Sequence, residues 1–162
     1  MREQAREIRW VKHDAELEAA LALRERVFCD EQGVPRSEEI DGRDDHAQHL
    51  VALDAEEGRV VGTLRLLLDG ETAKIGRVAV ATEARRQGIA LRMLELALIR
   101  ARELGCVRAR LAAQLCATEL YRRAGFTVES APFTEAGIEH VWMGRALPAE
   151  TASGPSPASA RR

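Results

Sequence analysis

The chain has 162 residues, a formal net charge of −2 at pH 7 and an isoelectric point near 6.1. This length suits one domain with a buried core, and the charge balance gives no general reason to expect nucleic-acid binding. No apolar run reaches the roughly 20 residues of a membrane-spanning helix, so no membrane association is expected. Three cysteines without CxxC spacing and an N-terminus without an apolar signal core predict a cytoplasmic protein.

The first part of the chain combines a predicted helix with an acidic stretch. Asp14 can cap a helix that runs to about Val27, because aspartate is a preferred N-cap residue. The next stretch, CDEQGVPRSEEIDGRDD, is rich in turn residues. Seven carboxylates lie between Asp30 and Asp45, against two arginines. We expect this acidic segment, residues 30–45, to lie exposed over or beside the core.

Three predicted strands follow the acidic segment. The stretches HLVALD and RVVGTLRLLL are apolar and rich in β-branched residues, and the turn residues AEEG join them. The turn DGE then leads into a third strand, AKIGRVAV, which ends at Val80. Turns this short predict an antiparallel meander.

An amphipathic helix is predicted directly after the meander. Apolar residues recur at steps of three and four through Ala90, Leu94, Ala97, Ala101 and Leu104. The helix should begin near Gln87 or Gly88 and stop at Gly105, since glycine commonly follows the last helical residue.

The turn before this helix, Arg85 to Gly88, can bind an anion. The first backbone N–H groups of a helix lack intrahelical partners, and the helix dipole places partial positive charge there. Gly88 allows a ligand to approach closely, and Arg85 and Arg86 can donate hydrogen bonds to phosphate oxygens. On these residues alone, a surface loop that contains arginines explains the pattern equally well.

The remainder of the chain adds strands and one short helix. CVRARLAAQ is a predicted strand, ATELYRRAG a short helix closed by Gly125, and FTVES and IEHVWMGRAL two further strands. The strand, helix, strand passage implies a right-handed crossover and one parallel pair in an otherwise antiparallel sheet. The sequence therefore predicts one mixed α/β (α+β) domain over residues 1–147. The Pro-, Ser- and Ala-rich residues 148–162 should form a disordered tail.

Two motifs in the second half resemble those of the GNAT superfamily of acyl-CoA-dependent N-acyltransferases. VAVATEARRQGIA is similar to its strand and pyrophosphate loop, with Arg85, Gly88 and Ala90 at the three signature positions, and ATELYRRAGF is similar to its later helix. Many members have glycine where this chain has Ala90. The stretches LRERVFCDEQGVP, EEIDGRDDHAQHLVA and PFTEAGIEHVWM narrow the resemblance to the ElaA-like branch. The resemblance covers residues 8–147.

This resemblance implies a central, mostly antiparallel sheet of six to seven strands with a splayed parallel pair and about four helices. Backbone groups of the strand RVAV would hold the pantetheine arm of acetyl-CoA, and an N–H near Val78 or Ala79 would stabilise the thioester oxyanion. The implied cofactor-binding residues are Val78, Ala79, Val80, Arg85, Arg86, Gln87, Gly88, Ile89, Ala90 and Gln114.

Tyr121 is the candidate acid for the departing thiolate. A tyrosine stays protonated at neutral pH, so the phenol can donate as the carbon–sulfur bond breaks. The alternative is a partly buried helix residue that satisfies one hydrogen bond.

The candidate bases are His140, Glu31 and a chain of water molecules, because the glutamate often suggested in the superfamily has no clear equivalent on KIGRVAV. His140 shares a strand face with Ile138 and Trp142 and can point into a pocket beside Phe133. A hydrogen-bonded structural histidine is the alternative. The expected acceptor-binding residues are Glu31, Gln32, Phe133 and His140.

The expected activity is acetyl transfer from acetyl-CoA to a primary amine of a small molecule or peptide, by direct attack in a ternary complex. A non-catalytic acyl-CoA sensor is the alternative. The acidic segment could attract a cationic amine, or could simply be solvated. We expect no metal at Asp45, His46 and His49, since no further ligands accompany them. The cysteines should be core residues, and exposed sheet edges near the C-terminus are compatible with a homodimer.

Overall fold

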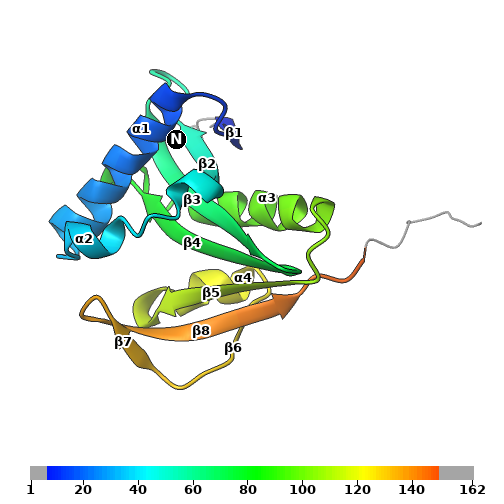
Figure 1. The fold of residues 1–162 in the computed structure, drawn as a ribbon. Helices are drawn as coiled ribbons and strands as arrows, with labels where there is room; N and C mark the ends of the chain where they lie inside the picture. Colours follow the sequence, from blue (N-terminus) through cyan, green and yellow to red (C-terminus); the bar gives the residue numbers. More distant parts are fainter. Residues whose placement is uncertain (1–6, 150–162) are drawn as a thin grey trace, which may run out of the picture.

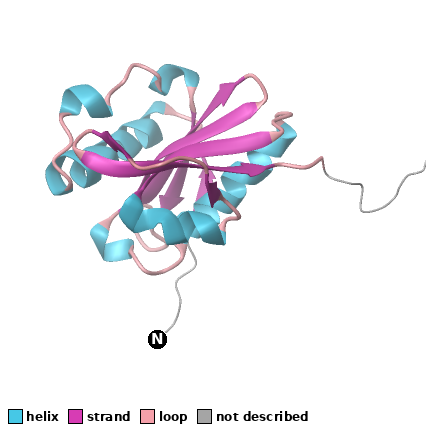
Figure 2. Cartoon of the chain, turned by 90° about the horizontal axis from the view of Figure 1, so that it is seen from below, coloured by secondary structure: helices cyan, strands magenta, loops and turns pink. Residues whose placement is uncertain are grey.

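The computed structural model describes residues 7–149 and contains an eight-stranded sheet with helices on both faces (Figures 1 and 2). The strands are β1 (Glu7–Trp10), β2 (Gln48–Leu53), β3 (Val60–Asp69), β4 (Thr72–Val80), β5 (Arg108–Gln114), β6 (Thr127–Val128), β7 (Phe133–Glu135) and β8 (Ile138–Ala146). The helices are α1 (Asp14–Arg24), the π-helix η1 (Glu25–Glu31), α2 (Arg36–Glu39), α3 (Ile89–Glu103) and α4 (Thr118–Arg123). Short 3-10 turns are η2 (Asp44–His46), η3 (Thr82–Ala84) and η4 (Leu115–Ala117).

The sheet has the order β1-β2-β3-β4-β5-β8-β6, and β7 pairs with β8. All of these pairs are antiparallel except β4 with β5. The predicted mixed fold with one parallel pair is therefore confirmed. Strands β1 and β7, which the sequence analysis did not identify, are only four and three residues long.

The parallel pair is held at one end only. Its register covers Thr72–Lys74 of β4 against Arg108–Arg110 of β5, and no pairing between the two strands follows. Strand β5 continues beside β8 as far as Gln114, while β4 continues beside β3 as far as Val80. Figure 1 shows the two strands meeting at one end and diverging toward the other. The sheet is therefore open between Val80 of β4 and Gln114 of β5, two of the residues that the sequence analysis expects in the site.

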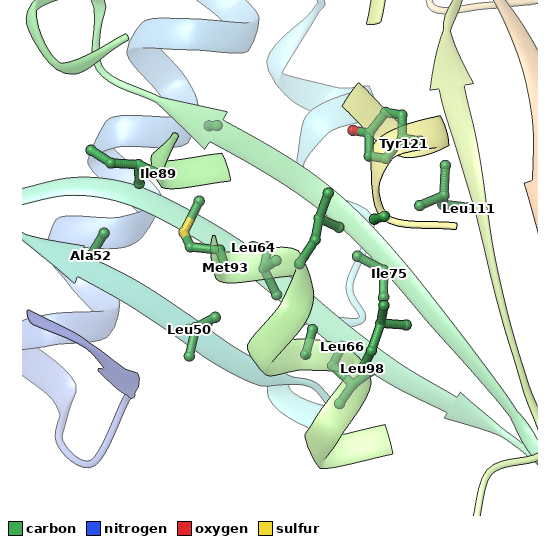
Figure 3. Close-up of a cluster of buried hydrophobic side chains, with 14 of the residues drawn as sticks. Leu50, Ala52, Leu64, Leu66, Ile75, Ile89, Met93, Leu98, Leu111 and Tyr121 are labelled. Atoms are coloured by element: carbon green, nitrogen blue, oxygen red, sulfur yellow. The ribbon is translucent and has the colours of Figure 1, made fainter. Parts of the chain in front are cut away.

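Helix α3 packs against one face of the sheet through a close contact at Gly62. A Cβ atom on Gly62 would lie 3.1 Å from Ile89 Cγ2 and 3.2 Å from the terminal methyl of Met93. Figure 3 shows Met93 and Leu98 of α3 beside Leu64 and Leu66 of β3 in this layer. Because Gly62 brings the start of α3 against β3, the turn at residues 85–88 is fixed relative to the sheet.

Two predicted helices differ in detail from the structure. The first ends at Arg24 and continues as the π-helix η1, and His13 occupies the N-cap without a side-chain hydrogen bond, so Asp14 is the first helical residue and not the cap. In α3 the buried stripe includes Ile89 and Met93, whereas the side chain of Leu104 is 42% exposed. Leu94, Ala97 and Ala101 of the predicted stripe are buried as expected, and packing over Gly62 extends the buried face to Ile89 and Met93.

The predicted tail, residues 148–162, lies outside the described residues except for Pro148 and Ala149. Among residues 7–149, no helix combines the length and the apolar character needed to cross a lipid bilayer.

Candidate functional site

The divergence of β4 and β5 forms a cavity of about 860 Å³. A second cavity of about 340 Å³ lies at the start of α3. The two share four lining residues, Val80, Arg85, Ala90 and Leu120. They therefore form one continuous cleft, which runs from the turn before α3 to the end where β4 and β5 pair.

The turn at the start of α3 has the backbone geometry of an anion site. Gly88 is the N-cap of α3 with φ of 80°, and Arg86 also has a positive φ, of 64°. Turns that contain left-handed residues direct neighbouring N–H groups toward one point, where the helix dipole adds positive character. A Cβ on Gly88 would meet nothing within 4 Å. Glycine is therefore favoured here by the positive φ, and not by a lack of space for a side chain.

Arg85, expected at the phosphates, lines both cavities and forms an ion pair with Glu31. Its two terminal nitrogens lie 3.0 and 2.7 Å from the Glu31 carboxylate, and its Nε donates to the carbonyl of Val80 at 2.9 Å. The cations that line the smaller cavity together with Arg85 are Arg86 and Arg123 of α4. Sequence reasoning missed Arg123, which lies one helical turn after Glu119 on the same face of α4.

The same ion pair argues against Glu31 as a general base. The hydrogen bond from Arg85 holds the pKa of the Glu31 carboxyl below its usual value, against an opposing effect of partial burial. A base that works near neutral pH needs a pKa close to that pH, because only then does it both accept and release the proton. Glu31 instead joins the end of η1 to the turn before α3.

A bulge in β4 shapes the wall of the cleft. The register with β3 shifts between Thr63, which faces Ala79, and Arg65, which faces Gly76. The extra residue lies at Arg77 and Val78, and Arg77 has a φ of 54°. Bulges of this kind redirect a strand next to binding sites. The three β4 residues expected at the cofactor, Val78, Ala79 and Val80, all line the larger cavity.

Three arginines and three carboxylates form an ion cluster behind this wall. Its members are Arg24, Arg65, Arg77, Glu39, Asp41 and Asp44. Arg24 Nε lies 2.7 Å from Glu39 and Arg24 Nη1 lies 2.8 Å from Asp44, while the Arg24 side chain is only 1% exposed. Arg65 Nη1 donates to Asp41 at 2.9 Å, and this hydrogen bonding lowers the pKa of the Asp41 carboxyl far below its usual value despite burial.

The ion cluster corrects the expected role of the acidic segment. Three of its seven carboxylates are bound to arginines of α1, β3 and β4, and Glu39 is buried. The segment is therefore only partly exposed. With the Glu31–Arg85 pair included, four of its seven carboxylates are bound to arginines outside the segment. Two carboxylates expected to attract a cationic amine, Glu39 and Asp41, are already paired.

Tyr121 lies on α4 at the wall of the larger cavity and is 8% exposed. Figure 3 shows its hydroxyl on the side away from Leu111. Among residues 7–149 the Tyr121 hydroxyl has no hydrogen-bond partner. The alternative of a helix residue whose hydroxyl makes one hydrogen bond within the protein is therefore not supported. Burial raises the pKa of Tyr121 to about 12. The phenol is therefore fully protonated at neutral pH.

His140 of β8 lines the same cavity and lies beside Phe133, as expected from the sequence. The two rings stack with centroids 5.8 Å apart. His140 Nδ1 lies 2.8 Å from the carbonyl oxygen of Ile138, which can only accept a hydrogen bond. Nδ1 thus carries the hydrogen in the neutral ring, and Nε2 is left with the lone pair that a base needs.

Two other predicted site residues bind each other at the mouth of the cleft. Gln114 Nε2 donates to Gln32 Oε1 at 2.9 Å, and both side chains line the larger cavity. Gln114 also faces His140 across the β5–β8 pair. The structure therefore brings the expected cofactor-side and acceptor-side residues together.

The cysteines and histidines outside this group have different positions. Cys106 is buried as expected, but Cys116 is exposed and lines the larger cavity, because η4 places it at the end of β5 and outside the core. His49 Nε2 lies 3.0 Å from the carbonyl oxygen of Asp44. In the described part of the chain, no three His, Cys, Asp or Glu side chains gather as metal ligands would.

Comparison with known proteins identifies the family. Residues 12–147 match the acetyltransferase (GNAT) domain, which is most of the chain. The chain belongs to the GNAT acetyltransferase family. Its Bacillus subtilis relative YjcF, described as an uncharacterized N-acetyltransferase, is 33% identical over 136 residues, which cover 82% of this chain and 94% of YjcF.

Two solved structures extend this comparison. An acyl-CoA N-acyltransferase from Pseudomonas aeruginosa is 31% identical, with a TM-score of 0.76 over 88% of this chain and 100% of that chain. Escherichia coli ElaA is 26% identical, with a TM-score of 0.76 over 86% of this chain and 99% of that chain. This GNAT protein is accordingly a transferase of the class that moves acetyl groups from acyl-CoA, and its resemblance to ElaA is confirmed.

Proposed function

We propose that this GNAT protein transfers an acetyl group from acetyl-CoA to a primary amine by direct attack within a ternary complex. The continuous cleft between β4 and β5 carries this proposal, because one end is a helix N-terminus suited to a diphosphate and the middle is an unpaired strand edge. Pantetheine contains amide groups that can pair with such an edge. The name of the Pseudomonas relative, an acyl-CoA N-acyltransferase, supports the same cofactor.

In the proposed reaction the amine nitrogen attacks the thioester carbonyl carbon. A carbon–nitrogen bond forms, the carbon–sulfur bond breaks, and its electron pair remains on sulfur. The nitrogen gives up one proton to Nε2 of His140, directly or through water. The products are the N-acetylated amine and the free thiol of CoA.

Tyr121 acts on the sulfur in this scheme. Its pKa of about 12 lies above that of a thiol, about 8.5, so complete proton transfer from the phenol to the thiolate is unfavourable. The Tyr121 hydroxyl therefore donates a hydrogen bond that stabilises the charge on sulfur as the bond breaks. Solvent then supplies the proton of the product thiol.

Cofactor binding and transfer can be tested separately. Thermal shift should show stabilisation by CoA and acetyl-CoA but not by ATP, and a thiol-release assay over a panel of amines should show amine-dependent release. Stabilisation by CoA without thiol release from any amine would instead support the non-catalytic sensor. No stabilisation by either CoA compound would overturn the proposed cofactor site.

A further inference from the structure

Two cations lie side by side at the end of the cleft that is opposite the Gly88 turn. Lys74 of β4 and Arg110 of β5 are register partners in the last pair before the strands diverge, and both line the larger cavity. Residues paired across neighbouring strands project from the same face. From Lys74 to Val80 is about 20 Å of extended chain. A cofactor with its diphosphate at the Gly88 turn therefore leaves the Lys74 end to the acceptor.

The guanidinium of Arg110 lies over the first ring of an aromatic stack that reaches His140. Its guanidinium carbon is 4.2 Å from the centroid of the Trp142 ring. The Trp142 ring stacks on Phe133 at 5.5 Å, and Phe133 stacks on His140 at 5.8 Å. A guanidinium held by its face on an indole presents its N–H edges to a ligand. The stack thus connects a positioned cation to the candidate base.

Each of these cations contacts one carboxylate that does not line the cavity. Glu129 receives two hydrogen bonds from Arg108, at 2.9 and 2.8 Å, and lies 3.8 Å from Arg110 Nε. Lys74 contacts Asp69 at 3.4 Å, and the Asp69 side chain is 70% exposed. Like charges directly opposite on paired strands are destabilising, so an anion between Lys74 and Arg110 would relieve a cost.

Several of the other charged groups that line the larger cavity are already paired. Glu39 and Asp41 are neutralised within the ion cluster by Arg65 and Arg77, and Arg85 is neutralised by Glu31. The remaining charged lining residues are Glu38, Arg43, Lys74, Arg110 and Glu135. Three of these five are cations, and Asp69 and Glu129, which contact Lys74 and Arg110, are not among the lining residues. The lining at Lys74 and Arg110 therefore favours an anionic group on the acceptor.

We infer that the acceptor is a small amine that carries a carboxylate, and that Arg110 and Lys74 bind this carboxylate while the amine lies toward His140. This inference rests on the proposed function for its reaction, but the carboxylate subsite can be measured without turnover. A guanidinium binds a carboxylate through two parallel hydrogen bonds, so Arg110 should contribute most of the selectivity.

Three amines with the same ring test the inference: benzylamine, 4-(aminomethyl)benzamide and 4-(aminomethyl)benzoate. In thiol release the benzoate should have a KM about tenfold below that of the benzamide, as expected for one hydrogen bond to a charged group. Arg110→Gln should remove this difference with little change in kcat, and Lys74→Gln should reduce it. Arg59→Gln is the control, since the Arg59 side chain is 55% exposed and lines neither cavity, and this variant should keep the preference.

Calorimetric titration of the same compounds into CoA-saturated protein separates the two claims. If no amine is acetylated but the benzoate still binds more tightly than the benzamide, the proposed function fails and the carboxylate subsite stands. Equal affinity for benzoate and benzamide overturns the subsite, whether or not turnover occurs. A weaker affinity for CoA in Arg110→Gln, with the preference unchanged, would assign the cations to the cofactor and also overturn the inference.

Discussion

Arg77 Nε lies 3.1 Å from Oε2 of Glu39, so a hydrogen-bonded ion pair joins the bulge of β4 to the short helix α2. Arg77 Nη2 also donates to the carbonyl oxygen of Glu39 at 2.8 Å. The backbone of Arg77 is left-handed, a conformation that costs energy for a residue other than glycine. Contacts from outside the strand therefore hold the bulge that forms the wall of the cleft.

Replacing Glu39 should destabilise the protein and loosen this wall. Glu39→Gln removes the charge that Arg24 and Arg77 share, and breaking a buried pair costs about 3 kcal/mol of unfolding free energy. Urea denaturation measures the loss, and the KM for acetyl-CoA should rise. Glu38→Gln, at the exposed neighbouring position, is the control and should unfold like the wild type. Equal stability of the two variants would show that the ion cluster does not hold the bulge.

Asp41 should make folding sensitive to acid. Its pKa is lower in the folded chain than in the unfolded chain, so the unfolded chain binds the proton more tightly. Its contribution is complete above the unfolded pKa of about 3.9 and is lost as the pH falls toward the folded pKa. The difference in Tm between wild type and Asp41→Asn should therefore shrink from pH 7 to about pH 2.5. A constant difference would contradict the assignment.

Gly88→Ala should weaken CoA binding through backbone strain. Alanine at the φ of 80° costs about 1 kcal/mol in stability and disturbs the N–H groups that we propose bind the diphosphate. Gly105→Ala is a matched control, because Gly105 ends the same helix with φ of 88° and also has no atoms near its missing Cβ. Both variants should lose similar stability, but only Gly88→Ala should raise the Kd for CoA in calorimetry. A similar CoA affinity for both would place the diphosphate elsewhere.

Tyr121→Phe should lower kcat and leave binding nearly unchanged. Phenylalanine keeps the edge-on contact with Phe126, whose ring centroid is 6.4 Å away, and removes only the hydroxyl. A loss of about 100-fold in kcat is expected if the hydroxyl stabilises the departing sulfur. The CoA-induced thermal shift should be retained. Full turnover in the variant would remove Tyr121 from the mechanism.

His140→Gln should slow proton removal from the amine. The expected loss in kcat is about 100-fold near neutral pH and smaller in alkaline buffer, where solvent can accept the proton. The pH profile of kcat for the wild type and the variant measures this. His13→Gln, on a side chain that is 63% exposed, should match the wild type throughout. Parallel profiles for His140→Gln and the wild type would exclude His140 as the base.

Local sequence signals were sufficient for the turn and helix that form the proposed cofactor site. The turn at residues 85–88 and the start of α3 follow from glycine, arginine and helical periodicity within a few positions. Gly105 and Gly125 have left-handed backbones just after α3 and α4, where the helix ends were predicted. The position of His140 beside Phe133 followed from the two-residue repeat of a strand.

Long-range pairs account for what the sequence analysis missed. Arg24 and Glu39 are 15 residues apart, Arg77 and Glu39 are 38 apart, and Arg85 and Glu31 are 54 apart. Periodicity contains no information about which distant charge will meet which. The pairing of Glu39 within the ion cluster and of Arg85 with Glu31 was therefore not predicted. The β4 bulge at Arg77 was missed as well, since its support comes from α2.

The three-pair contact between β4 and β5 makes the sheet two subsheets joined along a narrow seam. Unpaired strand edges normally invite aggregation when they face solvent, yet here two such edges face each other inside one molecule. A linear ligand with amide groups can close the open part of the seam, as an added strand would. Cofactor binding would then give hydrogen-bond partners to backbone groups of β4 that β5 leaves unpaired. Amide hydrogen exchange along residues 75–80 should therefore slow when CoA is bound.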